Sequence, residues 1–237
     1  LGALYPDVAY GMEGDTPSWL MLIQNGLNSP EHPNWGSWGG RYELYKPEMA
    51  SPSAGPVITG GVPVEPETRP IWTNADDSFS PRLSNKNGRT IRKDSVTYTG
   101  NQLTLWRWRE DFQNDFAARM DWCTKPYVEA NHPPVAKVNQ PEQFTVKSGD
   151  IFKLDADGSY DPDGDALSYL WLQYPEAGTY KGVVNFGGLS ENLYNVHTIK
   201  APEVTSPQTI HFILKLTDKG TPALSRYKRV IVTVVPK

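Results

Sequence analysis

An acidic stretch between two β-rich segments is the feature that most constrains how this chain can fold. Residues 155–165 read DADGSYDPDGD, with three Asp-Gly or Asp-Pro pairs in close succession. Such pairs form tight turns, because Asp accepts hydrogen bonds from its own backbone and Gly adopts positive φ angles. The flanking residues 151–154 and 169–172 are rich in aliphatic and aromatic side chains. The stretch therefore predicts two strands joined by an acidic turn, with Trp171 in the second strand.

The segment that follows Asn131-His132-Pro133-Pro134 has a β pattern throughout. Two prolines impose extended backbone and end any preceding helix, so this tetrapeptide predicts a domain boundary. Apolar side chains occupy alternate positions at 208–217 and 226–235, which is typical of strands with one buried face. The pattern predicts a β-sandwich over residues 131–237, with Trp171 in its core. Strands are expected at 143–146, 151–156, 168–173, 182–186, 208–217 and 226–235.

The single cysteine, Cys123, rules out a disulfide within the chain, so packing alone must hold the two sheets together. Because free cysteines are mostly small buried apolar groups, we expect Cys123 to be a buried and inert thiol.

Residues 1–130 have a mixed pattern. A helix is expected to begin at Thr16, with Pro17 in its first turn. The stronger prediction is a helix at 105–123, where large apolar side chains recur every four residues and two i,i+4 charge pairs add support. The apolar stripe is Trp108, Phe112, Phe116 and Met120, and the charge pairs are Arg107–Asp111 and Asp115–Arg119.

Two helices and irregular loops give about 130 residues a poor core of their own. We therefore expect residues 1–130 to be the C-terminal portion of a larger α/β domain. The predicted fold class is an incomplete α/β region over 1–130, followed by an all-β immunoglobulin-like sandwich over 131–237.

The composition argues against two classes of partner. The net charge is −4 and Lys and Arg form no long cluster, which argues against nucleic acid and against an anionic membrane surface. The sequence also lacks an apolar run of the length that crosses a bilayer. Eight Trp and 12 Tyr residues suit large aromatic cores or flat platforms for ring stacking.

A loop rich in tryptophan and glycine is the first candidate binding site. Trp35, Trp38, Arg41 and Glu43 lie within nine residues of one another. Loops run over the surface, where an indole can stack on the apolar face of a sugar ring while Arg or Glu bonds its hydroxyl groups. The alternative is that both tryptophans tuck under the loop and pin it in place.

The acidic turn is a candidate metal site. Asp161, Asp163 and Asp165 have the spacing of the first three ligands of an EF-hand, but Leu172 stands where its final Glu is required. An EF-hand is therefore excluded. A looser calcium site and turn chemistry alone remain as alternatives, and we favour turn chemistry.

Several long motifs resemble one family, the bacterial and fungal cellulose-binding proteins that join a nucleoside-hydrolase-like domain to a C-terminal immunoglobulin-like domain. Residues 155–171 also resemble the signature of extracellular modules of the polycystic-kidney-disease type. The motifs that carry the family resemblance are EGDTPSWL at 13–20, WGSWGGRYE at 35–43, RPIWTNA at 69–75, WRWR at 106–109 and NDFAARMDW at 114–122.

The resemblance implies a secreted or extracellular protein, with the periplasm as an alternative, that acts on or near plant polysaccharide. Nucleoside hydrolases hold a catalytic calcium through an N-terminal Asp motif, which we expect to lie upstream of this chain. They also place a late Asp ligand just ahead of a helix, a context similar to that of Asp15. An ordinary helix-capping carboxylate is the alternative for Asp15.

Three functions are thus expected from the sequence. The first is a polysaccharide-binding protein without activity, with cellulose or a related plant glycan as its partner. The second is the distal half of a calcium-dependent glycoside or N-riboside hydrolase, completed by the N-terminal part of the same protein. The third is a structural spacer.

Overall fold

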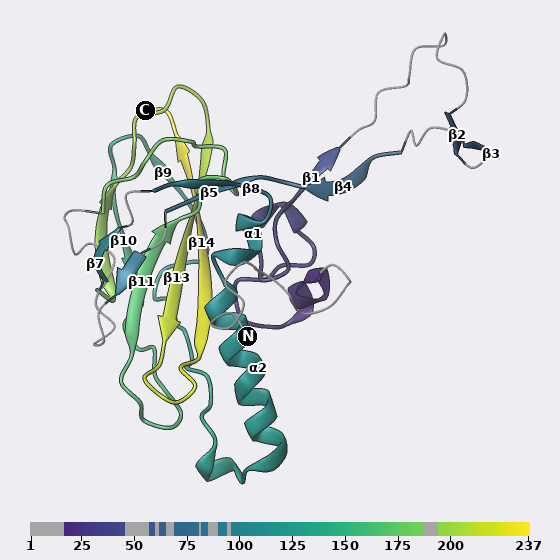
Figure 1. Ribbon diagram of the computed structural model, residues 1–237. Coiled ribbons are helices and arrows are strands. Elements are labelled where there is room, and N and C mark those ends of the chain that lie inside the picture. Colours follow the sequence, from purple (N-terminus) through teal and green to yellow (C-terminus); the bar gives the residue numbers. More distant parts are fainter. Residues whose placement is uncertain are drawn as a thin grey trace.

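The body of the protein is a β-sandwich (Figure 1), seen in a computed structural model that describes residues 17–45, 57–59, 62–64, 69–80, 82–84, 90–93, 96–186 and 194–237. One sheet has four strands, in the order β11 (Ser168–Gln173), β13 (Gln208–Thr217), β14 (Ser225–Val235) and β9 (Gln143–Lys147). The other pairs β10 (Ile151–Asp155) with β12 (Val196–Lys200). All neighbours are antiparallel except β14 and β9, which run parallel. The described chain is therefore mostly β-sheet, as the patterning of 131–237 predicts.

The inner faces of the two sheets form the main core. Trp171 is fully buried there, as predicted, and its Nε1 donates a hydrogen bond to the carbonyl of Asn195 at 3.3 Å. Alternate residues of β10 are buried, whereas the middle of β13 and of β14 is buried on both faces. The buried members are Phe152, Leu154, Ala156, Trp171, Val184, Ile199, Ala201, Ile210, Phe212, Leu214, Val230, Val232 and Val234.

The outer face of β13 and β14 is buried as well, because the N-terminal segment and the helices cover it (Figure 1). The covering elements are the 3₁₀ turns η1 (Pro17–Leu22) and η2 (Pro33–Trp35), with the helices α1 (Leu103–Trp106) and α2 (Arg109–Thr124). A third 3₁₀ turn, η3 (Tyr127–Glu129), follows α2. The second buried cluster is Leu20, Leu27, Trp38, Trp108, Phe112, Tyr174, Ile213 and Tyr227. Residues on both sides of the predicted 130/131 boundary thus share one core, and the boundary itself stays a prediction.

Charged groups join α2 to the sheet. Asp111 accepts hydrogen bonds from Lys215 Nζ, from Ser225 Oγ and from the Tyr227 hydroxyl. One turn later, Asp115 accepts from Arg226 Nη1 at 3.0 Å. Both carboxylates are buried, so the face of α2 that meets the sheet is acidic as well as apolar.

Short two-stranded pairs make up the remaining strands, and the described part of 1–130 holds no larger sheet. β1 (Tyr42–Tyr45) pairs with β4 (Ile71–Asn74), and this ribbon projects away from the sandwich (Figure 1). β5 (Asp77–Phe79) pairs with β8 (Tyr98–Gly100). The other pairs are β2 (Val57–Thr59) with β3 (Val62–Val64) and β6 (Arg82–Ser84) with β7 (Thr90–Lys93). An α/β domain is not seen in these segments.

The predicted helix at 105–123 is correct in place, and the first half of its apolar stripe, Trp108 and Phe112, is buried as expected, whereas the second half is not. It is interrupted near Arg107, and Phe116 and Met120 are 57% and 48% exposed. The sheet beneath α2 presents Lys215 and Arg226, so acidic residues face it where apolar ones were expected. The Asp115–Arg119 pair is confirmed at 2.7 Å.

Other expectations need correction. Arg107 pairs with Asp77 instead of Asp111, and Cys123 is exposed at the end of α2 instead of buried. Residues 182–186 form no strand, whereas β12 was missed because its five residues include the polar His197, Thr198 and Lys200. The helix expected from Thr16 is a 3₁₀ turn over Pro17–Leu22.

None of the helices in the described residues is long and apolar enough to cross a membrane.

Ile213 tests whether the outer face is covered in solution. Its side chain is fully buried on that face, so Ile213→Ala should lower the free energy of unfolding by about 2–5 kcal/mol. Urea denaturation measures this, with Ile151→Ala, at a position 72% exposed, as the control that should cost less than about 1 kcal/mol. Equal small losses for both variants would show that the outer face is open to solvent.

Candidate functional site

The loop after η1 lies directly against the backbone of β14. The carbonyl of Asn25 accepts a hydrogen bond from Tyr227 N at 2.9 Å, and Gly26 has φ +85°. A Cβ on Gly26 would lie 2.0 Å from the Tyr227 carbonyl oxygen, so only glycine permits this approach. Asn28 fixes the loop internally, because its side chain bonds the carbonyls of Leu20 and Ile23 and the amide of Trp38.

Of the two alternatives for this loop, an open platform for sugar stacking is not what the two tryptophans form. Trp38 is 0% exposed, and its Nε1 donates to the Tyr227 hydroxyl at 3.2 Å. Trp35 is half-buried, with His32 stacked on its ring at 3.8 Å and the Arg229 guanidinium over the ring at 5.5 Å. The alternative, that the tryptophans pin the loop, describes Trp38.

Arg41 belongs to a buried ionic cluster. Its Nε donates to Asp77 Oδ1 at 2.7 Å. The other carboxylate oxygen of Asp77 accepts from the Tyr174 hydroxyl at 2.6 Å and from Arg107 Nη1 at 3.1 Å. Burial, followed by the charge of Asp77, raises the pKa of Tyr174 well above its usual value, so the phenol stays a donor. The cluster fixes the base of the β1–β4 ribbon to the sandwich.

Of the four predicted residues in this loop, only Glu43 is exposed. It lies on β1, directly across from Thr73 of β4. The structure therefore does not bring Trp35, Trp38, Arg41 and Glu43 to one surface.

The β1–β4 ribbon carries exposed aromatic side chains that sequence reasoning did not select. Leu44 lies opposite Trp72, and Tyr45 lies opposite Ile71, so each pair shares one face of the ribbon. All four side chains are exposed, with Trp72 at 48% and Tyr45 at 49%. The sequence did indicate that Trp72 is exposed. Trp72 lies within the motif at 69–75, where no helical or strand periodicity predicts a buried face.

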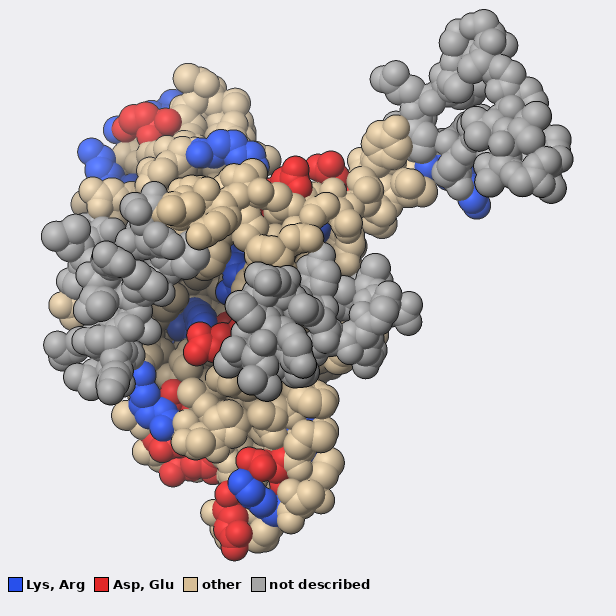
Figure 2. Space-filling view, in the orientation of Figure 1, with Lys and Arg blue, Asp and Glu red and all other residues tan. Residues whose placement is uncertain are grey.

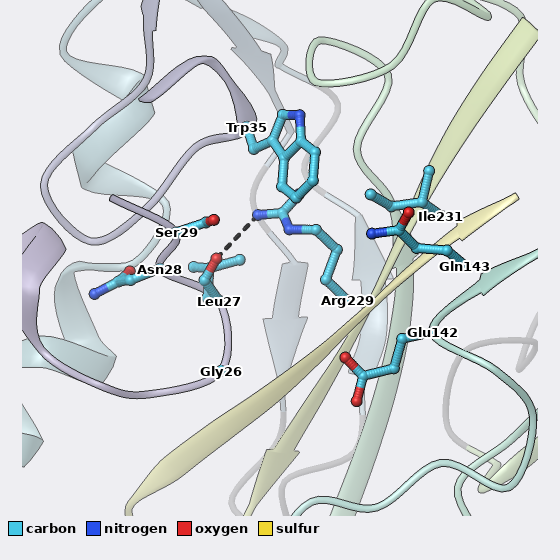
Figure 3. A pocket seen from close by; sticks show the side chains of 9 residues that line it. All are labelled: Gly26, Leu27, Asn28, Ser29, Trp35, Glu142, Gln143, Arg229 and Ile231. Atoms are coloured by element: carbon cyan, nitrogen blue, oxygen red, sulfur yellow. Dashed lines mark hydrogen bonds between the residues drawn. The ribbon is translucent and has the colours of Figure 1, made fainter. Parts of the chain in front are cut away.

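A second feature is a cavity between the loop and the edge of the four-stranded sheet. Its volume is about 160 Å³, and Arg229 of β14 lies in its wall beside Trp35 (Figure 3). Nη2 of Arg229 donates to the carbonyls of Leu27 and Gly36, both at 3.1 Å, and Nη1 donates to Nδ1 of His211 at 3.1 Å. The lining residues are Gly26, Leu27, Asn28, Ser29, Trp35, Glu142, Gln143, Arg229 and Ile231.

Burial lowers the pKa of both Arg229 and His211. It lowers the pKa of Arg229 to about 10, which leaves the guanidinium charged at neutral pH. Burial, with a smaller effect from the charge of Arg229, lowers the pKa of His211 to about 3. His211 is therefore neutral, and its Nδ1 is an acceptor for Arg229.

The acidic turn is held by its own hydrogen bonds. Asp161 Oδ1 accepts from the backbone amides of Asp163 and Asp165, at 2.9 and 3.2 Å. Asp163 Oδ2 accepts from the backbone amide of His132 at 2.6 Å. Across the described ranges, no group of three or more His, Cys, Asp or Glu residues could hold a metal ion. Calcium at this turn stays an untested prediction, and Asp15 lies outside the described residues.

His211 predicts a pH dependence of stability. Its pKa is below the ordinary value of 6.5 in the folded protein, so the unfolded chain takes up the proton first as the pH falls. Above pH 6.5, His211 is neutral in both states and does not change the free energy of unfolding with pH. Below pH 6.5, its protonation in the unfolded chain lowers the free energy of unfolding by about 1.4 kcal/mol per pH unit. Between pH 6.5 and 5, His211→Gln should therefore lose about 2 kcal/mol less unfolding free energy than the parent, as measured by urea titration. Parallel curves for the two proteins would show that His211 titrates normally.

Two family models match parts of this chain. The family model "Cellulose-binding Sde182, nucleoside hydrolase-like domain" matches residues 1–42, and the model "Cellulose-binding protein Sde0182, C-terminal domain" matches residues 151–234. No curated protein sequence matches the chain.

Two solved structures illustrate the similarity. A nucleoside hydrolase-related hypothetical protein from Saccharophagus degradans, described as associated with carbohydrate metabolism, is 31% identical over 99% of this chain, with a TM-score of 0.67. The chain spans 50% of that protein's length. The PKD domain of the KIAA 1837 protein is 22% identical over 43% of this chain and 86% of its own, with a TM-score of 0.32, too low to support an argument.

The two family models match in the expected order, and the Saccharophagus structure aligns with nearly the whole chain. These matches confirm the resemblance of this chain to the cellulose-binding proteins in which a nucleoside-hydrolase-like domain precedes a C-terminal domain.

Proposed function

We propose that this chain is the C-terminal part of a polysaccharide-binding protein, that its polysaccharide is cellulose or a related plant glycan, and that it binds through the β1–β4 ribbon. Both matching family models describe cellulose-binding proteins, which supports the class of ligand. The observation that carries the location is the exposure of Trp72 and Tyr45 on a ribbon that projects from the body (Figure 1).

The chemistry of the ribbon suits a glucan chain. An exposed indole stacks on the apolar face of a glucose ring, and Trp72 offers on the order of 100 Å² of apolar surface. At about 25 cal/mol per Å², burial of that surface contributes about 2–3 kcal/mol. On the opposite face of the ribbon, Glu43 lies on the same side as Tyr45, so a carboxylate acceptor for sugar hydroxyl groups accompanies the second aromatic ring.

The charge distribution supports an uncharged polymer as the partner. On the face of the molecule drawn in Figure 2, the coloured side chains of both signs are interspersed and form no extended patch of one sign. A polyanion such as nucleic acid is bound through clustered Lys and Arg. A neutral glucan needs no such cluster.

We further propose that residues 1–130 are the C-terminal portion of a nucleoside-hydrolase-like domain, as the match over residues 1–42 supports. The hydrolase alternative would then depend on an Asp motif and calcium supplied by another part of the protein. Because cellulose is an extracellular polymer, this proposal includes secretion. Binding is preferred to hydrolysis for the present chain, because the exposed aromatic ribbon offers a means of binding.

Retention on microcrystalline cellulose tests the proposal. Trp72→Ala should weaken the affinity of the whole chain for cellulose by about tenfold or more, because a stacking contribution of about 2–3 kcal/mol is lost. Trp19→Ala is the matched control, since Trp19 is also 48% exposed but lies on η1, and its retention should be unchanged. The whole chain is used because residues 131–237 alone would expose the outer face of β13 and β14.

Each contrary result has a defined meaning. Equal retention of the two variants and the parent would remove the ribbon as the binding site. Failure of the parent to bind any insoluble glucan would leave the structural-spacer role instead.

A further inference from the structure

Arg229 is a buried cation whose hydrogen-bond partners are all neutral. The residue is only 8% exposed, and it donates to two backbone carbonyls and to the neutral ring of His211. Among the described residues, no carboxylate forms an ion pair with it. Its Nε–H and one N–H of Nη1 also have no described partner.

The other cations under the outer layer each pair with a carboxylate. Arg41 and Arg107 pair with Asp77, Lys215 pairs with Asp111, and Arg226 pairs with Asp115. Burial of a charge is costly unless an opposite charge compensates it. Arg229 departs from this rule, and a cavity lies beside it.

The one carboxylate in the cavity lining is already engaged. Glu142 Oε1 accepts from Lys228 Nζ at 2.5 Å. In Figure 3, the Glu142 carboxylate and the Arg229 guanidinium lie toward opposite ends of the arginine side chain. The guanidinium is therefore available to an anion from outside the chain.

Two further polar groups converge on the same space. The Ser29 hydroxyl and the Gln143 side-chain amide both line the cavity and bond none of the described residues. In Figure 3 they approach the guanidinium from opposite sides, one from the loop after η1 and one from β9, with Trp35 along a third side. A volume of about 160 Å³ corresponds to about five water molecules, enough for a carboxylate and part of one sugar ring.

We propose that this cavity binds a hexuronic acid residue, with the carboxylate on the guanidinium of Arg229 and the sugar hydroxyl groups on Ser29 and Gln143. A single fixed cation, with Glu142 in the same lining, suits a singly charged carboxylate better than a doubly charged phosphate. The choice of a sugar over another carboxylic acid rests on the proposed polysaccharide-binding function. The site would let the protein recognise an acidic sugar in addition to a neutral glucan.

Calorimetric titration of the whole chain with sodium D-glucuronate tests this assignment. A dissociation constant of about 1 mM or lower is expected for a ligand of this size. D-glucose, which lacks the carboxylate, and acetate, which lacks the sugar, should each bind at least tenfold more weakly. Inorganic phosphate is the probe for a doubly charged ligand and should also bind more weakly.

Variants locate the binding in the cavity. Ser29→Ala and Gln143→Ala remove groups without a structural partner, so each should weaken glucuronate binding about threefold to tenfold while the fold is kept. Arg229→Gln removes the charge and should weaken binding by tenfold or more. Gln24→Ala, at an exposed position outside the cavity, is the matched control and should bind as the parent does. If Arg229→Gln does not fold, as judged by circular dichroism, the Ser29 and Gln143 variants still decide the matter.

Several results would overturn the proposal. Glucose or acetate binding as tightly as glucuronate would remove the carboxylate or the sugar from the assignment. Phosphate binding most tightly would replace the ligand class, and absence of glucuronate binding would refute the site. Retention on cellulose depends on Trp72, so a failure here is distinguishable from a failure of the proposed function.

Discussion

Burial of the outer face of β13 and β14 is the constraint on which the rest of the structure depends. A sandwich needs only its inner faces covered, yet here Ile213 and Tyr227 on the outer face are also fully buried. Gly26 allows the loop backbone to touch β14, and Trp38 fills the space between Tyr227 and Phe112. The cavity beside Arg229 lies where the loop after η1 meets β9, the edge strand of the four-stranded sheet.

Ionic hydrogen bonds fix the position of the covering layer, where apolar packing alone would allow it to slide. Asp111 and Asp115 each accept from groups on the sheet, and Asp77 joins the base of the ribbon to Tyr174 after β11. Breaking one partner of such a buried pair leaves an uncompensated charge, so these contacts act together. The β1–β4 ribbon can present aromatic side chains away from the body because its base is held at Arg41 by this arrangement.

The sequence was a good guide to the strands and a poor one to their surroundings. Alternation located β13 at its observed bounds and placed Trp171 in the core. The same alternation placed His211 and Arg229 on the outer face of the sheet. It could not show what covers that face, because a period of two shows only which residues lie on the same side. On α2, the period predicted a buried Phe116, whereas the sheet beneath selects Asp115 through Arg226. Long-range charge pairing of this kind leaves no local signal.

The two proposed sites would bind related ligands through different interactions, apolar stacking at the ribbon and charge pairing in the cavity. A flat exposed ring such as Trp72 gains free energy from apolar area and reads little of a sugar's identity, since every pyranose has an apolar face. A desolvated guanidinium flanked by Ser29 and Gln143 gains less area but discriminates strongly, because a neutral ligand would leave its charge uncompensated. On the two proposals, binding strength would come from the ribbon and selectivity for an acidic sugar from the cavity. This division follows from where the outer layer leaves aromatic surface exposed and where it leaves a charge buried.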